Sequence, residues 1–479
     1  MAKSVRDEIV AKRRSRVASL GHAEGADLPA EREAPLVPFL GSGGLICEIK
    51  RRSPSKGDIA AGLDAAERAG AYIRAGAANL SVLTEPEGFG GSLADLLRVK
   101  QAHPRVAALR KDFLFDPEDI DVSWRAGADA VLLIAGMLPG ERLAALHARA
   151  LSFGMRALVE VHDREDIRKA AAFSPDLVGI NSRDLASFAI DPLLPPILAA
   201  GIGWPASLVY ESGIAHPEQA AFAAACGFKG LLVGEAVMRR PELIGRIAAA
   251  LRETRRDAFW PALARRLFNR PPGRPLVKIC GLTSEADARL AADCGADLLG
   301  FVFWPGSPRR ADPACLRRLG DVGVLKIGVV VNPAGSRQLP PEVRELLTEG
   351  RLDALQLHGQ EEPDDCRELW PAYYKALRPG RPEDLAEKGG YRSPRLLLDA
   401  SAARPGGSGR RVAEAILDAW KGPLWLAGGL DPDNVRAVAA GWRPELVDVA
   451  SGVEAAPGRK DAGKLRRFFA EIDGIRTDA

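Results

Sequence analysis

The sequence has few of the residues that build disulfide frameworks or metal centres. Its six cysteines are scattered along 479 residues, at positions 47, 226, 280, 294, 315 and 366, and none forms a C-x-x-C pair. A chain of this length does not need disulfides to be stable, so we expect free thiols in a reducing compartment. The six histidines are equally dispersed, and no zinc-ligand spacing occurs. The sequence therefore predicts no metal site.

Long apolar segments and a strong charge imbalance are also missing. No apolar stretch approaches the roughly 20 residues of a membrane-spanning helix, and the N-terminus has no apolar targeting region. The formal net charge is only +3, so composition gives no reason to expect nucleic-acid or membrane partners. Hydrophobic residues make up 47% and charged residues 27%, the balance of a soluble globular protein. We therefore expect a cytoplasmic protein.

What the chain has instead is one pattern that occurs twice. Short apolar runs alternate with polar loops and alanine-rich helical stretches, which is typical of parallel strands joined by helices. The first eight runs are Leu45–Lys50, Asn79–Thr84, Ala107–Lys111, Ala130–Ala135, Ala157–Val161, Leu177–Asn181, Ser207–Glu211 and Gly230–Val233. The second eight are Leu276–Cys280, Leu298–Phe303, Leu325–Val331, Ala354–Leu357, Tyr373–Leu377, Leu396–Asp399, Leu424–Ala427 and Leu446–Ala450. The fold class is therefore α/β, with two consecutive (β/α)8 barrels, which fit the chain length.

Two segments lie outside the repeated pattern. Residues 4–20 are predicted to form a basic amphipathic helix that precedes the first barrel. Several helix breakers fall within Asn269–Pro275, so residues 259–275 are predicted to be a connector. The predicted domains are then 1–258 and 276–479.

The end of the first run combines opposite charges. Strand side chains alternate between faces, so Glu48 and Lys50 point the same way. A carboxylate beside an ammonium can handle protons and anions, although an isolated pair at a strand end is usually a simple salt bridge. The following stretch, Ser53–Gly57, adds hydroxyl and N–H donors that suit an anion. Cys47 faces the opposite side, and we interpret it as a packed thiol.

Other runs of the first set also end in charged or amide side chains, at Lys111, Glu160, Asn181 and Glu211. Because a barrel has its chemistry where strands lead into the following loops, these groups are predicted to converge. Lysines and glutamates at one mouth would shift each other's pKa and supply both an acid and a base. Glycines after the last two runs suit a phosphate site. His162 and His216 also lie near strand ends, and we favour ordinary packing for both.

Six motifs in this half, CEIKRRSPSKG, LRKDF, LVEVH, INSRDL, ESGI and VGEAVM, together resemble indole-3-glycerol phosphate synthase over about residues 40–258. The resemblance implies closure of a pyrrole ring on a carboxyphenylamino deoxyribulose phosphate, with loss of CO2 and water. It implies that Lys111 is the acid for ring closure and that Lys50 holds the substrate carboxylate. Which of the two lysines donates at which step stays open.

The same resemblance implies roles for the remaining residues of this site. Glu48 and Glu160 would handle the later proton transfers. Asn181 and Glu211 would orient the substrate. The substrate-binding residues would be Ser53, Phe89, Phe113, Arg183, Ser212, Gly213 and Gly234. For the two phenylalanines, walls for the benzoate ring and ordinary loop packing are both open.

The second set of runs has different groups at the same positions. Its first run ends in Lys278 and Cys280, which share a face, with Cys280 nearer the mouth. Most cysteines are buried structural thiols, but a cysteine at the end of a barrel strand is a better candidate for a catalytic residue. Run four leads to His358 and run six ends in Asp399. Glycines again follow runs seven and eight and suggest a phosphate cradle.

The motifs KICGLT, FVFWPGSPR, LQLHG, LLLDA, LAGGL and VDVASGVE resemble phosphoribosylanthranilate isomerase over about residues 275–472. The resemblance implies an Amadori rearrangement with Cys280 as the base and Asp399 as the acid. A thiolate base would need a lowered pKa, to which Lys278 could contribute, and the acid would need a raised one.

By the same resemblance, Arg309 or its neighbour Arg310 would bind the anthranilate carboxylate. The other substrate-binding residues would be His358, Gly428, Gly429, Asp448, Ser451 and Gly452. Ala450 departs from the family pattern, which more often has serine there.

Together the two resemblances imply a fused, bifunctional enzyme of tryptophan biosynthesis. Both reactions are acid–base chemistry on phosphosugar–anthranilate substrates, so we expect no metal or organic cofactor, no nucleic-acid or membrane partner, and a monomer. One alternative is that a single barrel is active and the other is a phosphate-binding scaffold. Another is a binding module without activity. Both are disfavoured because Lys111, Glu160, Cys280 and Asp399 are all present.

Overall fold

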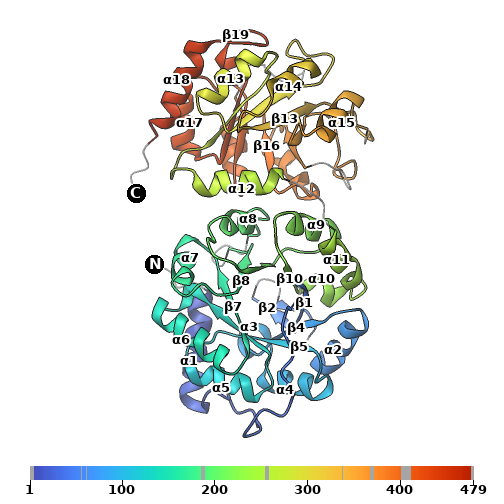
Figure 1. The fold of residues 1–479 in the computed structure, drawn as a ribbon, viewed down its shortest axis with the longest axis vertical. Coiled ribbons are helices and arrows are strands. Elements are labelled where there is room, and N and C mark those ends of the chain that lie inside the picture. The colour runs from blue at the N-terminus through green and yellow to red at the C-terminus, as the bar shows by residue number, and fades with distance from the viewer. Residues whose placement is uncertain are drawn as a thin grey trace. The chain divides into compact units, whose positions relative to one another are not determined.

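The computed structural model describes residues 5–41, 43–54, 57–60, 62–184, 189–253, 258–336, 338–366, 372–400 and 411–475. The chain divides into two compact units, residues 1–256 and 257–479. Each unit contains one closed barrel of parallel strands (Figure 1). The predicted α/β class with two consecutive barrels is confirmed.

The first barrel has the closed strand order β1-β4-β5-β6-β7-β8-β9-β10. Its strands are β1 (Gly44–Ile49), β4 (Asn79–Leu83), β5 (Ala107–Lys111), β6 (Ala130–Ile134), β7 (Arg156–Val161), β8 (Leu177–Asn181), β9 (Ser207–Glu211) and β10 (Gly230–Val233). Each coincides with a run predicted from the sequence. A small hairpin of β2 (Arg52–Ser53) and β3 (Gly57–Asp58) follows β1.

Helices cover the outside of this barrel (Figure 1). They are α1 (Val5–Leu20), α2 (Ala65–Arg74), α3 (Pro86–Phe89), α4 (Leu93–Ala102), α5 (Pro117–Arg125), α6 (Gly140–Ser152), α7 (Arg164–Ala171), α8 (Leu194–Ala199), α9 (Pro217–Ala225), α10 (Glu235–Arg239) and α11 (Leu243–Arg252). Several begin at a capping side chain, such as Asp64 before α2, Ser92 before α4 and Asp163 before α7.

The second barrel runs in the order β11-β12-β13-β14-β15-β16-β17-β18. Its strands are β11 (Leu276–Ile279), β12 (Leu298–Val302), β13 (Leu325–Val330), β14 (Ala354–Leu357), β15 (Tyr373–Leu377), β16 (Leu396–Leu398), β17 (Trp425–Ala427) and β18 (Leu446–Val449), and each again falls on a predicted run.

The helices of this unit are α12 (Phe259–Asn269), α13 (Glu285–Asp293), α14 (Pro313–Leu319), α15 (Pro341–Thr348), α16 (Glu414–Ala419), α17 (Val435–Trp442) and α18 (Ala462–Asp473). A hairpin of β19 (Glu454–Ala456) and β20 (Arg459–Lys460) follows the last strand.

An apolar floor fills the interior of the first barrel. It is built by buried side chains that include Phe39, Leu40, Ile46, Leu109, Leu132, Leu158, Val209 and Leu232. Two residues beyond Ile46, Leu109, Leu158 and Val209 along their strands stand Glu48, Lys111, Glu160 and Glu211. Since strand side chains repeat with a period of two, these charged groups share the inward face and stand directly above the floor.

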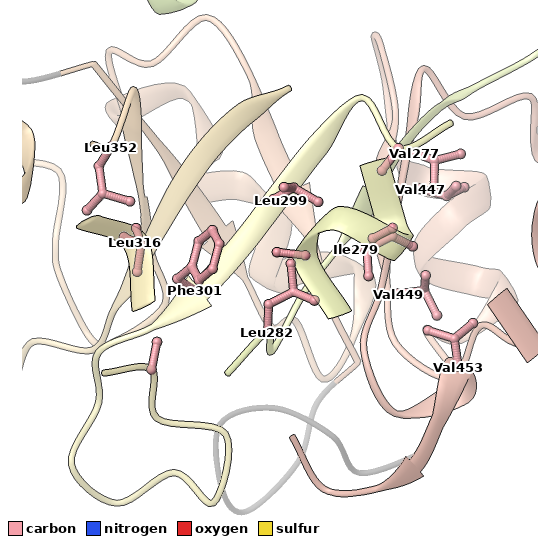
Figure 2. Close-up of a cluster of buried hydrophobic side chains, with 14 of the residues drawn as sticks. Val277, Ile279, Leu282, Leu299, Phe301, Leu316, Leu352, Val447, Val449 and Val453 are labelled. Atoms are coloured by element: carbon pink, nitrogen blue, oxygen red, sulfur yellow. The ribbon is translucent and has the colours of Figure 1, made fainter. Parts of the chain in front are cut away.

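In the second barrel the outward-facing strand residues form a large core with the surrounding helices. Val277, Ile279 and Phe301 of the strands belong to the same buried cluster as Leu316 of α14 (Figure 2). The alternation that turns Val277 and Ile279 outward turns Lys278 inward, and Cys280 lines the cavity at the mouth. The two polar residues of this strand therefore lie on the face predicted from the sequence.

The stretch predicted as a connector contains a well-packed helix, α12, which belongs to the second unit. Its Trp260 is buried and lies 6.4 Å, between ring centroids, from Trp425 at the start of β17. Leu263 and Leu267 are also buried, at the spacing of one helix face. The helix therefore closes the N-terminal end of the second barrel.

Helix α1 lies where the sequence predicted, but ion pairs hold it as much as apolar packing does. Among residues 8–20 of this helix, Ile9 and Arg13, one turn apart, are the buried ones. The Arg13 guanidinium donates to Asp119 at 2.8 and 3.3 Å and lies 3.2 Å from Asp112. Burial alone would raise the pKa of Asp119, but Arg13 lowers it to about 2.

Among helices in the described ranges, none combines the length and the apolar character needed to cross a bilayer.

We predict that a fragment of residues 257–479 folds, whereas one of residues 274–479, which lacks α12, is much less stable. The shorter fragment loses four large buried apolar side chains of α12, Phe259, Trp260, Leu263 and Leu267, each contributing roughly 1.5–3 kcal/mol. Urea unfolding of both fragments measures the difference. Equal midpoints would mean that α12 is a passive connector.

We predict that Arg13→Met destabilises the first unit by up to about 3–5 kcal/mol, because Asp112 and Asp119 stay buried with one cation fewer, although Arg110 remains 2.9 Å from Asp112. Their pKa values are lowered in the folded state, so the stabilisation is present above their unfolded pKa of about 3.9 and is lost as the pH falls further. The difference in the free energy of unfolding between wild type and variant, measured with urea, should therefore become smaller as the pH falls below about 4. Lys12→Met, at an exposed ion pair on the same helix, should cost less than about 1 kcal/mol.

Candidate active sites

A cavity of about 470 Å³ opens at the C-terminal ends of the first barrel's strands. The structure brings together here every site residue predicted for this barrel: Glu48, Lys50, Ser53, Phe89, Lys111, Phe113, Glu160, Asn181, Arg183, Glu211, Ser212, Gly213 and Gly234. Sequence reasoning missed Ile9 of α1, which also lines the cavity. Ile9 does not follow a strand, and only the docking of α1 brings it there.

Lys111 is the centre of the charged groups in this cavity. Its Nζ donates to Glu160 Oε2 at 3.3 Å and to Glu211 Oε2 at 3.2 Å. Glu160 in turn is approached by Asn181, whose Nδ2 donates to Oε1 at 3.4 Å, and by His162, whose Nε2 lies 2.9 Å from Oε1. The two glutamates therefore share one lysine, but Glu160 has additional partners.

The unequal partners separate the two glutamates electrostatically. Burial raises the pKa of Glu211, and the neighbouring charge of Glu160 raises it further. Burial has the same effect on Glu160, but Lys111 and His162 outweigh it and lower its pKa. Although burial opposes a charged lysine, the surrounding carboxylates raise the pKa of Lys111. At neutral pH the site therefore contains an ammonium, an ionised carboxylate and a carboxyl group that can hold a proton.

Glu48 and Lys50 form a second charged pair at the end of β1. Burial raises the pKa of Glu48, but Lys50 and Lys111 bring it below its usual value. A Cβ added to Gly234 would lie 2.3 Å from Glu48 Oε2 and 2.8 Å from Lys50 Nζ. Gly234, predicted as a phosphate ligand, is thus also required to leave room for this pair. In the same way, a Cβ at Gly179 would lie 2.0 Å from Glu211 Oε1.

The rim of this cavity combines donors with aromatic surface. Ser212 and Gly213 both have positive φ, 67° and 76°, a conformation that is uncommon for serine and often marks functional loops. Phe89 and Phe113 face each other with ring centroids 6.4 Å apart. Of the predicted anion-binding stretch after Lys50, Ser53 lines the cavity, while Ser55 and Lys56 lie outside the described residues.

A second cavity lies at the corresponding end of the second barrel. It is lined by almost all the residues predicted for this site: Cys280, Arg309, His358, Asp399, Gly428, Gly429, Asp448 and Ser451. Gly452 is the exception, because it packs against the backbone of Leu430, and a Cβ there would lie 1.9 Å from the Leu430 carbonyl oxygen. Gly300 of β12 was missed. A Cβ at this position would lie 2.7 Å from Cys280 Sγ, so glycine leaves space for the thiol.

A chain of polar contacts crosses the floor of this cavity. Lys278 Nζ donates to Asp448 Oδ2 at 2.6 Å and to Gln356 Oε1 at 2.7 Å. Gln356 Nε2 lies 2.7 Å from His358 Nδ1, and His358 Nε2 lies 3.2 Å from Asp399 Oδ2. Gln356, in the middle of the chain, was missed because a glutamine inside an apolar run gives no sequence signal of chemistry.

The Cys280 thiol does not have the lowered pKa that the sequence led us to expect. Burial raises the pKa of this thiol, and Lys278 offsets only part of the effect. The physical reason is that Asp448 lies 2.6 Å from the lysine and compensates its charge. The lowered pKa that a thiolate base would need is therefore absent here, and the thiol is mainly protonated at neutral pH.

Arg309, and not Arg310, points into the second cavity. It donates through Nε and Nη2 to both oxygens of Glu454, at 2.8 to 3.1 Å. Lys460 also donates to Glu454, at 3.0 Å, and to the carbonyl oxygen of Cys280 at 2.6 Å. Arg310 instead lies 3.4 Å from Glu342 on the exposed surface. Glu454 and Lys460 were missed because they come from the hairpin after β18.

Within the described residues, no three His, Cys, Asp or Glu side chains are grouped so that they could hold a metal ion.

Comparisons with known proteins match each unit to one family. Residues 6–249 match indole-3-glycerol phosphate synthase, and residues 277–471 match N-(5'phosphoribosyl)anthranilate (PRA) isomerase. The tryptophan biosynthesis protein TrpCF of Yersinia pestis is 33% identical, over 89% of this chain and 84% of its own length. A multifunctional tryptophan biosynthesis protein of Phycomyces blakesleeanus is 34% identical, over 90% of this chain and 63% of its own length.

The chain spans about three fifths of the length of the multifunctional fungal relatives, at 63%, 59% and 62% of their residues. Among solved structures, phosphoribosyl anthranilate isomerase from Thermus thermophilus is 38% identical, with 42% of this chain and 100% of that chain covered and a TM-score of 0.36.

Proposed function

The chain belongs to the family of tandem indole-3-glycerol phosphate synthases and phosphoribosylanthranilate isomerases, and on this basis we propose that it is a bifunctional enzyme of tryptophan biosynthesis. The second barrel isomerises N-(5-phosphoribosyl)anthranilate to 1-(2-carboxyphenylamino)-1-deoxyribulose 5-phosphate. The first barrel closes the indole ring of that product with loss of CO2 and water. The observation that carries the proposal is that each cavity gathers an acid–base set suited to one of these reactions.

In the isomerase barrel, Asp399 protonates the ribose ring oxygen, and the ring opens to an iminium. The Cys280 thiolate then removes the proton from C2, giving an enolamine that becomes the ketone. His358, 3.2 Å from Asp399, orients the acid. The two side chains transfer one proton each, in opposite directions, so the reaction needs no net proton.

Arg309 is the group that we assign to the anthranilate carboxylate in this barrel. Its pairing with Glu454 uses the Nε and Nη2 side of the guanidinium, so the Nη1 edge remains for a second carboxylate. Arg310 is directed to Glu342 instead, which is why we choose Arg309. Gly428, Gly429 and Ser451 at the far side of the cavity suit the phosphate.

In the synthase barrel, Lys111 protonates the ketone oxygen as the carbon–carbon bond forms. Lys50 holds the carboxylate that leaves as CO2. The ionised Glu160 accepts a proton in the later dehydration, with Glu48 assisting. Glu211, whose pKa is raised by burial, keeps a proton with which it donates to the substrate, together with Asn181. Phe89 and Phe113 form the wall for the benzoate ring, and Ser53, Arg183 and Gly213 suit the phosphate.

That the chain acts as a monomer in the cytoplasm and has no nucleic-acid partner stays a prediction from composition.

The direct experiment supplies phosphoribosylanthranilate to the purified chain and follows the ketose intermediate and indole-3-glycerol phosphate together. Appearance of both is expected. Formation of the ketose alone, or of neither, would reject activity in one or both barrels.

We predict that Lys111→Ala lowers the synthase kcat/KM by roughly 10²–10⁴-fold and leaves the isomerase unchanged, since general acid–base groups contribute about this much. Asp399→Asn should do the reverse. Each variant serves as the folding control for the other, because both steps are assayed on the same chain. If either substitution abolished both activities in a folded protein, two independent sites would be the wrong description.

We predict that the isomerase kcat/KM rises with pH through the neutral range. The pKa of the Cys280 thiol is raised, so the fraction of thiolate at pH 7 is small and grows tenfold per pH unit until the thiol titrates. Initial rates between pH 6 and 9.5 test this, with the synthase rate of the same samples as the reference. A flat profile over that range would argue against Cys280 as the base.

A further inference from the structure

His162 is a mostly buried histidine, with 14% of its side chain exposed, that contacts a glutamate of the synthase site, and the proposed mechanism gives it no role. It follows β7, two residues after Glu160. Its Nε2 lies 2.9 Å from Glu160 Oε1, on the far side of that carboxylate from Lys111, which approaches Oε2. Both ring nitrogens are shielded from solvent and neither has a partner in hydrogen-bond geometry among the described residues, so the 2.9 Å approach to Glu160 is an ion-pair contact. The imidazole therefore interacts with protein groups and not with bulk water.

The other side of the ring faces a second carboxylate. Nδ1 lies 3.7 Å from Asp166 Oδ2, and the same oxygen accepts the backbone N–H of His162 at 3.0 Å. Asp166 lies in the first turn of α7, where its own N–H donates to the capping residue Asp163 at 2.8 Å. The helix start thus fixes Asp166, which holds the backbone of His162 by a hydrogen bond and places a second carboxylate beside the ring.

The surroundings of the ring favour its charged form. Burial lowers the pKa of His162, but Asp166 and Glu160 outweigh it and raise the pKa to about 9. The other charged groups near this array are Lys169 of α7, 3.9 Å from Asp166, and Lys111 of β5, which lies between Glu160 and Glu211 of β9. The negative charge of Glu48 on β1 also raises the pKa of Lys111.

The contact is the charged difference between the two glutamates; the other difference is the neutral Asn181, whose Nδ2 donates to Glu160 Oε1 at 3.4 Å. Glu160 and Glu211 lie at nearly the same distance from Lys111, 3.3 and 3.2 Å. Two close carboxylates around one cation cannot both ionise at equal cost, so a further asymmetry decides which one keeps a proton. The imidazolium touches Glu160, and Glu211 lies against Gly179.

We propose that His162 is a positioning residue of the synthase site that acts as an imidazolium: held between Asp166 and Glu160, it keeps Glu160 ionised and thereby leaves the proton of the glutamate pair on Glu211. The catalytic meaning of this assignment rests on the proposed function of the first barrel, whereas the protonation state itself can be measured independently of activity.

The first test is the pH profile of the synthase reaction in His162→Gln. Glutamine keeps a hydrogen-bond donor but has no charge, so Glu160 loses one of its two cations and binds a proton more readily. The acidic limb of kcat/KM should move to higher pH by roughly one unit, which corresponds to a tenfold change in proton affinity. The rate on the plateau should change far less. His162→Lys restores a permanent charge and should bring the limb back toward the wild-type position.

A matched control is His103→Gln, the same substitution in the same unit. His103 Nε2 contacts the carbonyl oxygen of Ala66 at 3.0 Å, between α4 and α2, so the pH profile should not move. The isomerase rate of every variant, measured on the same full-length chain, reports that the protein is intact.

The second test is NMR titration of the six histidines in the full-length chain, with the signal of His162 identified by its loss in His162→Gln. That imidazole should stay protonated until about pH 9. A neutral His162 at pH 7, or a His162→Gln enzyme slowed equally at every pH, would overturn the proposal and leave His162 a structural residue. If the wild-type chain produced no indole-3-glycerol phosphate, the proposed function would fail, and the NMR titration would still decide the protonation state.

Discussion

Lys111 in the first barrel carries a constraint that shapes the rest of that site: one buried ammonium stands between two carboxylates. The barrel imposes this crowding, because parallel strands bring all their C-terminal ends to one rim and alternate side chains to one interior. An apolar floor beneath them prevents water from screening the charges from below. The glutamates therefore differ in protonation, and their neighbours decide which of the two keeps a proton.

The second barrel meets the same geometric constraint in another way. Its buried cation, Lys278, is neutralised locally by Asp448, and Gln356 and His358 extend the polar contacts across the floor to Asp399. Cys280 and Asp399 therefore do not share a cation, whereas Glu160 and Glu211 of the first barrel share Lys111. This arrangement suits a reaction in which one group takes a proton at carbon while another gives one at oxygen.

The fold and most of both sites could be predicted because they depend on local patterns. Strand boundaries follow apolar runs, and runs such as Ala107–Lys111 match the strand residue for residue. What could not be predicted depends on partners distant in sequence. Arg13 and Asp119 are 106 positions apart, and Lys278 and Asp448 are 170 apart. The pKa of the Cys280 thiol depends on that second pair. The residues next to the cysteine in the sequence therefore could not predict whether this pKa is raised or lowered.

The glycines beside the reactive groups have a consequence for how these barrels can change. Glu211 lies over Gly179, Cys280 over Gly300, and the Glu48 carboxylate over Gly234. In each case the reactive side chain occupies the volume that a neighbouring backbone position leaves by having no side chain. A larger residue at any of these glycines therefore displaces the reactive group beside it and disturbs the existing activity. Single-step evolution of either barrel is thereby directed away from the strand ends and toward the loops around the mouth.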